Sequence, residues 1–277
     1  MQPAFQFALD SWSLPIPVTV ALILTAFIYL RGWLHLRRAF RNAVRMWQMV
    51  AFLSGLFSVW LAVGSPLGAL DEQWLSVHMV QHLLLMTVAP PLILLGAPPF
   101  LLLHGLPPSF SRSFLGPLLR TSLVERIGHL VREPVFCWLA AILVLIGWHV
   151  PAAFSLGLQS RFWHEVEHAS FFVAGLLFWW PVISPWPSLP CHSRWSIVLY
   201  LFLATLPCDA LSAYLAFCDR VVYTEYLSVP RQFGMTALQD QECAGALMWV
   251  FVTFAYLLPA VFLTTNLLWR SEAEEQG

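Results

Sequence analysis

The segment "WLSVHMVQHLLLMTVAPPLILL" (residues 74–95) decides the fold class of this chain. It contains no Asp, Glu, Lys or Arg, and a helix of this length crosses the roughly 30 Å hydrocarbon core of a bilayer. Two histidines, His78 and His82, lie four residues apart near its start, so a helix places both imidazoles on one face. The segment predicts a membrane-spanning helix with two imidazole side chains on one side.

The composition of the whole chain is typical of a polytopic membrane protein. Of its 277 residues, 59% are hydrophobic and 10% are charged, whereas a soluble domain carries about 25% charged residues. The net charge of −1 argues against nucleic acid as a partner. All 14 basic residues are arginine, and the absence of lysine excludes Schiff-base chemistry such as retinal binding. The five cysteines do not resemble a disulfide framework.

Six further apolar segments extend this prediction to the rest of the chain. We expect an all-α, polytopic membrane helix bundle that forms a single domain over residues 1–277, with about seven transmembrane helices. The fourth span is short. The expected spans are at about residues 16–31, 45–65, 74–95, 134–150, 162–183, 195–218 and 241–266.

The arginines predict how the bundle is oriented. They concentrate in the first connection (Arg31, Arg37, Arg38, Arg41 and Arg45) and in the third (Arg112, Arg120, Arg126 and Arg132). The positive-inside rule therefore predicts an outer N-terminus and a cytoplasmic C-terminus. Residues 108–132 mix arginines with spaced leucines and phenylalanines, which predicts an amphipathic segment lying on the cytoplasmic lipid surface.

With this orientation, unusual polar residues of five spans fall in the outer half of the membrane. Ionisable groups inside a membrane are costly and normally have partners or functions. The candidate metal ligands are His78, His82, His149, His164 and His168. Candidate supporting or additional ligands are Glu167, on the same helix face as His164 and His168, together with Asp209, Asp240, Cys208 and Cys243.

The donor types favour a soft or borderline metal ion. Neutral imidazole is the commonest protein metal ligand, and thiol or thioether groups nearby suit copper or zinc rather than magnesium or calcium. We expect copper, as Cu(I), with zinc as the second choice. The expected role is non-enzymatic.

Three other interpretations remain open from the residues alone. A copper importer or proton-coupled carrier would need polar residues continuing into the inner halves of the spans. A b-type cytochrome would use histidines of two helices as axial ligands. A membrane metallohydrolase is suggested by "HEVEH" (residues 164–168), which fits the zinc-peptidase pattern H-E-x-x-H.

Four ordered motifs resemble one known family. They are "HMVQHLLLMTVAPPLILLGAP" (78–98), "GWHVPAAF" (147–154), "FWHEVEHASFFVAGLLFWWPVI" (162–183) and "DQECAGALMWV" (240–250). From about residue 45 onward the chain resembles the CtaG-type cytochrome c oxidase assembly factors, polytopic bacterial membrane proteins tied to caa-type haem-copper oxidases. In the last motif Cys243 departs from the expected pattern.

The resemblance implies a role in placing copper in the copper-B centre of the oxidase. It implies that the five histidines are the family's histidine set, with Asp209 and Asp240 as accompanying acids. The implied partners are the catalytic subunit of cytochrome c oxidase, an unidentified copper donor and the lipid bilayer. The implied location is the bacterial cytoplasmic membrane.

Overall fold

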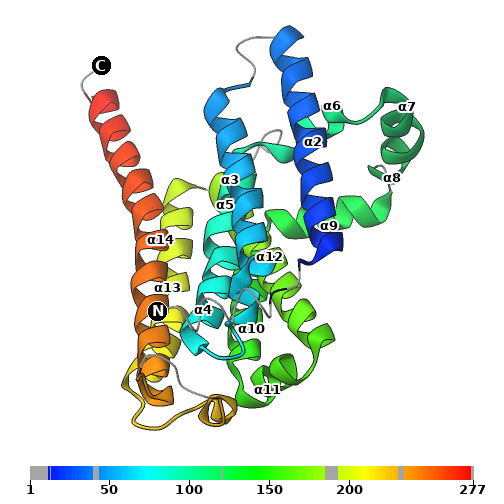
Figure 1. Ribbon diagram of the computed structural model, residues 1–277. Helices are drawn as coiled ribbons and strands as arrows, with labels where there is room; N and C mark the ends of the chain where they lie inside the picture. The colour runs from blue at the N-terminus through cyan, green and yellow to red at the C-terminus, as the bar shows by residue number, and fades with distance from the viewer. Residues whose placement is uncertain are drawn as a thin grey trace.

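The computed structural model describes residues 12, 14–39, 44–119, 121–184, 193–229 and 234–275. Most of these residues are in helices, and they contain no β-strand. The long helices run side by side as a bundle, as Figure 1 shows. They are α2 (Ile16–Ala39), α3 (Met46–Val63), the continuous run of α4 (Leu75–Leu83), η2 (Leu84–Val88) and α5 (Ala89–Leu95), α10 (Pro134–His149), α12 (Arg161–Ile183), α13 (Arg194–Phe217) and α14 (Ala237–Glu275).

Shorter elements connect these helices. At one end lie η1 (Pro66–Ala69), α11 (Pro151–Gln159) and η4 (Thr224–Leu227), drawn at the bottom of Figure 1. The remaining connections contain α6 (Pro98–Gly105), α7 (Pro108–Phe110), η3 (Ser111–Leu115), α8 (Gly116–Leu119) and α9 (Ser122–Arg132). The first two expected spans and the last three coincide with α2, α3, α12, α13 and α14, and the third with the continuous run α4–η2–α5.

Among the described residues, six helices are long and apolar enough to cross a membrane, or seven if one bent pair is counted as a span. The bent pair is α9 and α10, which meet at 82°. At about 1.5 Å per residue, α10 alone is about 24 Å long, shorter than a typical hydrocarbon core. The expected short fourth span is therefore the short helix α10, which follows α9 after a sharp turn.

The first connection is shorter than expected. Helix α2 continues to Ala39, so Arg31, Arg37 and Arg38 lie on the helix rather than in a loop. Arg45 is the residue before α3, while Arg41 and Arg120 lie outside the described residues. Arg37 and Arg38 lie in the last turn of α2 and Arg45 directly before α3, so these three flank the same connection. The membrane orientation of the termini remains a prediction.

Residues 108–132 form the short helices α7 to α9 with η3 between them. On α9, Leu123, Ile127 and Leu130 are all exposed and follow a helical spacing. This arrangement fits an amphipathic helix with an unpaired apolar face. Its location on a lipid surface remains a prediction.

A proline pair explains how the third span bends at its centre. The run α4–α5 is interrupted by η2 (Leu84–Val88), a π-helical turn, and Pro90 and Pro91 follow it without amide hydrogens. The freed carbonyl of Met86 accepts a hydrogen bond from Trp179 Nε1 at 3.2 Å. A Cβ on Gly175 would lie 2.7 Å from the same carbonyl oxygen, so only glycine lets α12 pack this closely. Helices α4, η2 and α12 are thereby fixed against one another.

Candidate metal centre

Helix α4 begins at a buried carboxylate of another helix. Asp240 of α14 is fully buried, and its Oδ2 and Oδ1 accept hydrogen bonds from the amides of Leu75 (2.8 Å) and Ser76 (3.2 Å). These amides belong to the first turn of α4, and the first amides of a helix have no hydrogen-bond acceptor within the helix itself. Asp240 therefore caps α4 from outside, and its negative charge is favourable at a helix N-terminus. Asp240, expected from the sequence to be a supporting or additional ligand, thus binds the backbone of the helix that carries His78 and His82.

The two histidines of α4 face one carboxylate. His78 Nε2 and His82 Nε2 lie 3.5 Å and 3.3 Å from Glu167 Oε1. All three side chains are buried, and the two rings are 4.4 Å apart between centroids. Nitrogen and oxygen atoms of the three residues lie within 4.8 Å of one another, close enough to hold one metal ion. Glu167, predicted to support the histidines, thus lies beside the two histidines of α4.

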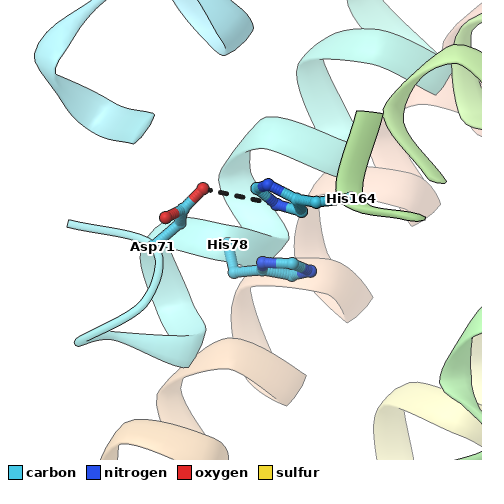
Figure 2. A group of neighbouring side chains, drawn as sticks. All are labelled: Asp71, His78 and His164. Carbon is cyan, nitrogen blue, oxygen red and sulfur yellow. Dashed lines mark ion pairs between the residues drawn. The ribbon is translucent and has the colours of Figure 1, made fainter. Parts of the chain in front are cut away.

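A second group of donors shares His78. His164 Nε2 of α12 lies 3.5 Å from Asp71 Oδ2, as the dashed line in Figure 2 marks. The rings of His78 and His164 are stacked, with centroids 5.6 Å apart. Ligand atoms of Asp71, His78 and His164 again lie within 4.8 Å of one another. His164 keeps 23% of its side-chain surface exposed, so this group lies nearest to solvent.

Asp71 is the ligand candidate that sequence reasoning missed. It lies in the connection before α4, where no helical spacing relates it to the histidines. In the folded chain it is fully buried, and the Tyr226 hydroxyl donates a hydrogen bond to its carbonyl oxygen at 2.8 Å. Burial raises the pKa of Asp71 to about 6, against the opposing effects of His78 and Gln81. The available signal was an acid in a short loop at the same end of the bundle as the histidines.

His149 and His168 complete the cluster. The ring centroid of His82 lies 6.2 Å from that of His149 and 5.8 Å from that of His168. His149 Nδ1 lies 2.7 Å from the carbonyl oxygen of Leu145. This contact places a proton on Nδ1 and leaves Nε2 unprotonated, the form that binds metals. Five histidines from three helices therefore form one continuous cluster, as the spacing predicted.

The other predicted supporting residues belong to neither of the two ligand groups found in the described part of the chain. Asp209 lies near the hydroxyls of Thr205 and Thr253, between α13 and α14. Cys243 is partly exposed on α14 and belongs to neither metal-binding group. Cys208 is buried on α13 and lines a small cavity together with His82 and His149. Asp209, Cys208 and Cys243 are therefore not brought to the ligand groups within the described part of the chain.

The first acid of "HEVEH", Glu165, points out of the site. Glu165 Oε1 pairs with Arg161 Nε at 3.2 Å, and the Glu165 side chain is 67% exposed. The general base of an H-E-x-x-H peptidase has to reach the metal-bound water. Glu165 does not occupy that position, and the buried acid of this helix is Glu167.

The cluster has the properties of a cation site. Asp71 and Glu167 are buried carboxylates without an arginine partner within the described residues. Besides the Nε2 atoms of His78, His82 and His164, which face carboxylates, four buried ring nitrogens make no hydrogen bond there. They are Nδ1 of His78, Nδ1 of His82, Nε2 of His149 and Nε2 of His168. Buried polar groups are normally bonded, and buried charges are paired or coordinate metals. The donor set of imidazoles with one or two carboxylates fits copper or zinc.

Comparison with known proteins identifies the family. Residues 27–270 match the family described as cytochrome c oxidase caa3 assembly factor (Caa3_CtaG). The chain belongs to this family. The match extends over most of the chain and confirms the resemblance seen in the four motifs.

Curated relatives of this assembly-factor chain are longer proteins. Uncharacterized proteins of Mycobacterium bovis and Mycobacterium tuberculosis are each 26% identical over 275 residues. The aligned region covers 95% of this chain and 40% of each relative. The chain thus spans less than half the length of these relatives. No solved structure matches the chain.

Proposed function

We propose that this protein binds a copper ion in the cluster of His78, His82, His149, His164 and His168 and delivers it to the copper-B centre of a haem-copper oxidase. The family is that of cytochrome c oxidase caa3 assembly factors. The observation that carries the proposal is the buried set of imidazole nitrogens without hydrogen bonds beside two buried carboxylates. Such a site is stabilised by a bound cation.

Copper is the cargo in this proposal. His78, His82 and Glu167 would hold the ion, and Asp71 with His164 would receive it nearer to solvent. His78 belongs to both groups, so an ion can exchange one ligand at a time without leaving the protein. The acceptor would be the catalytic subunit of the oxidase in the bacterial cytoplasmic membrane, docked at the end of the bundle that carries Asp71 and His164. A separate donor protein would supply the copper.

The other interpretations fit the geometry less well. A haem needs a flat pocket of several hundred Å³, whereas the cavity that adjoins His82 and His149 has a volume of about 20 Å³. A peptidase would need Glu165 at the metal, but that side chain is exposed and paired with Arg161. We therefore assign the protein a non-enzymatic role.

The proposal is tested by the copper content of an oxidase assembled in cells. A caa3-type oxidase produced together with the wild-type protein is expected to contain its copper-B ion and full oxidase activity. Production with the His78→Ala/His82→Ala variant should lower both severalfold, while His104→Ala/His129→Ala, on exposed histidines elsewhere, should change neither. Full copper-B content with the His78→Ala/His82→Ala variant would refute copper delivery through this site.

A further inference from the structure

A small cavity lies directly beneath the histidine cluster. It has a volume of about 20 Å³, and its walls include His82 of α4 and His149 of α10. A volume of roughly 10–15 Å³ on this measure is enough for one water molecule. The cavity can therefore hold a single ion or water but no larger ligand.

Sulfur atoms dominate the reactive part of the cavity wall. Its sulfur-containing residues come from four elements: Met79 of α4, Met86 of η2, Met248 of α14 and Cys208 of α13. All four are buried, with exposed fractions of 0–7%. Met86 owes its position to the π-helical turn before Pro90, where Trp179 binds the Met86 carbonyl. Turns of this kind are frequent at functional sites.

Packing alone does not account for this wall. Methionine often fills irregular gaps in a core, but a gap filled for packing alone has no reason to include an unsatisfied imidazole. His149 Nε2 is buried, makes no hydrogen bond within the described chain, and belongs to a residue that lines the cavity. Its Nδ1 is held by the Leu145 carbonyl, so the ring is fixed in the metal-binding tautomer. An unpaired nitrogen beside three thioethers and a thiol forms a ligand set.

We propose that this cavity is a second metal site, selective for Cu(I), with Met79, Met86, Met248, Cys208 and His149 as its candidate ligands. Thioether donors favour Cu(I) over zinc, whereas zinc is bound mainly by thiolate, imidazole and carboxylate, so the three methionines give the site its preference for Cu(I). This proposal rests on the proposed function, because it takes copper to be the ion that the protein delivers. The site differs from the histidine–carboxylate centre in donor type and in depth.

His82 connects the two sites. It faces Glu167 in the metal centre and also lines the sulfur cavity. Along the helix axis, Met86 lies about 12 Å further into the bundle than His78, at about 1.5 Å per residue. Copper can pass between the sites by exchange of ligands at His82. The inner site then holds Cu(I) away from water and excludes zinc.

The test compares Cu(I) and Zn(II) on the full-length protein in detergent. Metal stoichiometry is measured with each ion in excess, and X-ray absorption at the copper edge reports sulfur ligands. The wild type is expected to bind one more Cu(I) than Zn(II) per chain, with sulfur in the copper shell. Met79→Leu/Met248→Leu with Cys208→Ala should lose the additional Cu(I) and the sulfur signal but retain zinc, which also shows that the variant is folded. Met46→Leu, on an exposed methionine, is the matched control and should behave as wild type.

The outcomes separate this site from the proposed function. Zinc and copper bound in equal number, with only nitrogen and oxygen around copper, would overturn the sulfur site and leave the histidine centre intact. A sulfur-deficient variant that still binds the additional Cu(I) would overturn it as well. Absence of both metals from the wild type would overturn the proposed function itself. Sulfur-bound Cu(I) that persists in His78→Ala/His164→Ala would support an independent inner site.

Discussion

Glu167 is the residue on which the geometry of the metal centre depends most directly. Its Oε1 faces both His78 and His82, and the side chain is almost completely buried. A carboxylate in this position either ligates the ion or orients the imidazoles that do, and in both cases its charge offsets that of the cation.

Replacing Glu167 by Gln should therefore weaken metal binding while leaving the shape of the side chain nearly unchanged. We expect about a 10- to 100-fold loss of copper affinity, the usual effect of removing a partner of ligating histidines. The measurement is a competition titration with a chelator of known affinity. Glu165→Gln is the matched control two residues away, because Glu165 is exposed; an equal loss there would argue against a specific role for Glu167.

Asp71 gives the metal-free protein a pH dependence of known sign. Burial raises its pKa from 3.8 to about 6, so the folded state keeps a proton that the unfolded state releases. The contribution of Asp71 to stability is fully present below about pH 4 and is lost as the pH rises through about 6.

The variant Asp71→Asn should remove this dependence. In thermal unfolding of metal-free protein we expect the variant to be more stable than wild type at pH 7.5, with the difference vanishing near pH 4. Copper affinity should change in the opposite direction, because the variant lacks the carboxylate. Glu72→Gln, on the adjacent exposed acid, should show neither effect. A wild-type protein that gains stability between pH 4 and 7.5 relative to Asp71→Asn would contradict the assignment.

At the scale of elements, α11 makes room for the carboxylate of α12. A Cβ on Gly157 would lie 2.7 Å from Glu167 Oε2, too close for an undisplaced side chain. The end of a glutamate can move, but here movement takes it away from His78 and His82.

The variant Gly157→Ala is therefore expected to lower copper affinity about tenfold, within the range seen when groups around a metal are disturbed. Its effect on thermal stability should be small, because alanine favours the helix. Gly147→Ala provides the control, since nothing lies within 4 Å of a Cβ added to that glycine in α10. Similar affinities for the two variants would show that α11 does not constrain Glu167.

Helix α4 depends on α14 for its first turn. Asp240 accepts hydrogen bonds from the amides of Leu75 and Ser76, which lie three and two residues before His78. Without the Asp240 carboxylate, the first turn of α4, directly before His78, becomes less ordered.

We expect Asp240→Ala to destabilise the protein by about 1–2 kcal/mol, the cost of removing a capping side chain, and to weaken copper binding through a less ordered His78. Chemical denaturation in detergent measures the first effect and metal titration the second. Glu242→Ala, on an exposed acid of the same helix, should leave both unchanged. Wild-type stability for Asp240→Ala would mean that the cap is dispensable.

At the scale of the whole molecule, the sequence predicts the helices and their polar faces but not how the connections pack over them. Apolar runs without charges gave six of the expected spans, and the 3.6-residue period placed Glu167 on the face of His164 and His168. The position of Asp71 depends on how the connection after α3 folds back over the histidines, which no periodicity encodes. The distance of Asp209 from the imidazoles likewise depends on the rotation of α13, because a single acid does not fix a helix face.

The most direct test of the central claim is elemental analysis of the purified protein after loading with copper and removal of excess ion. The histidine–carboxylate centre predicts at least one copper ion per chain, and a strong reduction in His78→Ala/His82→Ala but not in His104→Ala/His129→Ala. The bound ion should also raise the unfolding temperature, and a chelator should reverse that rise. Wild-type protein with no copper or zinc above background, and a melting temperature that neither metal changes, would contradict the account.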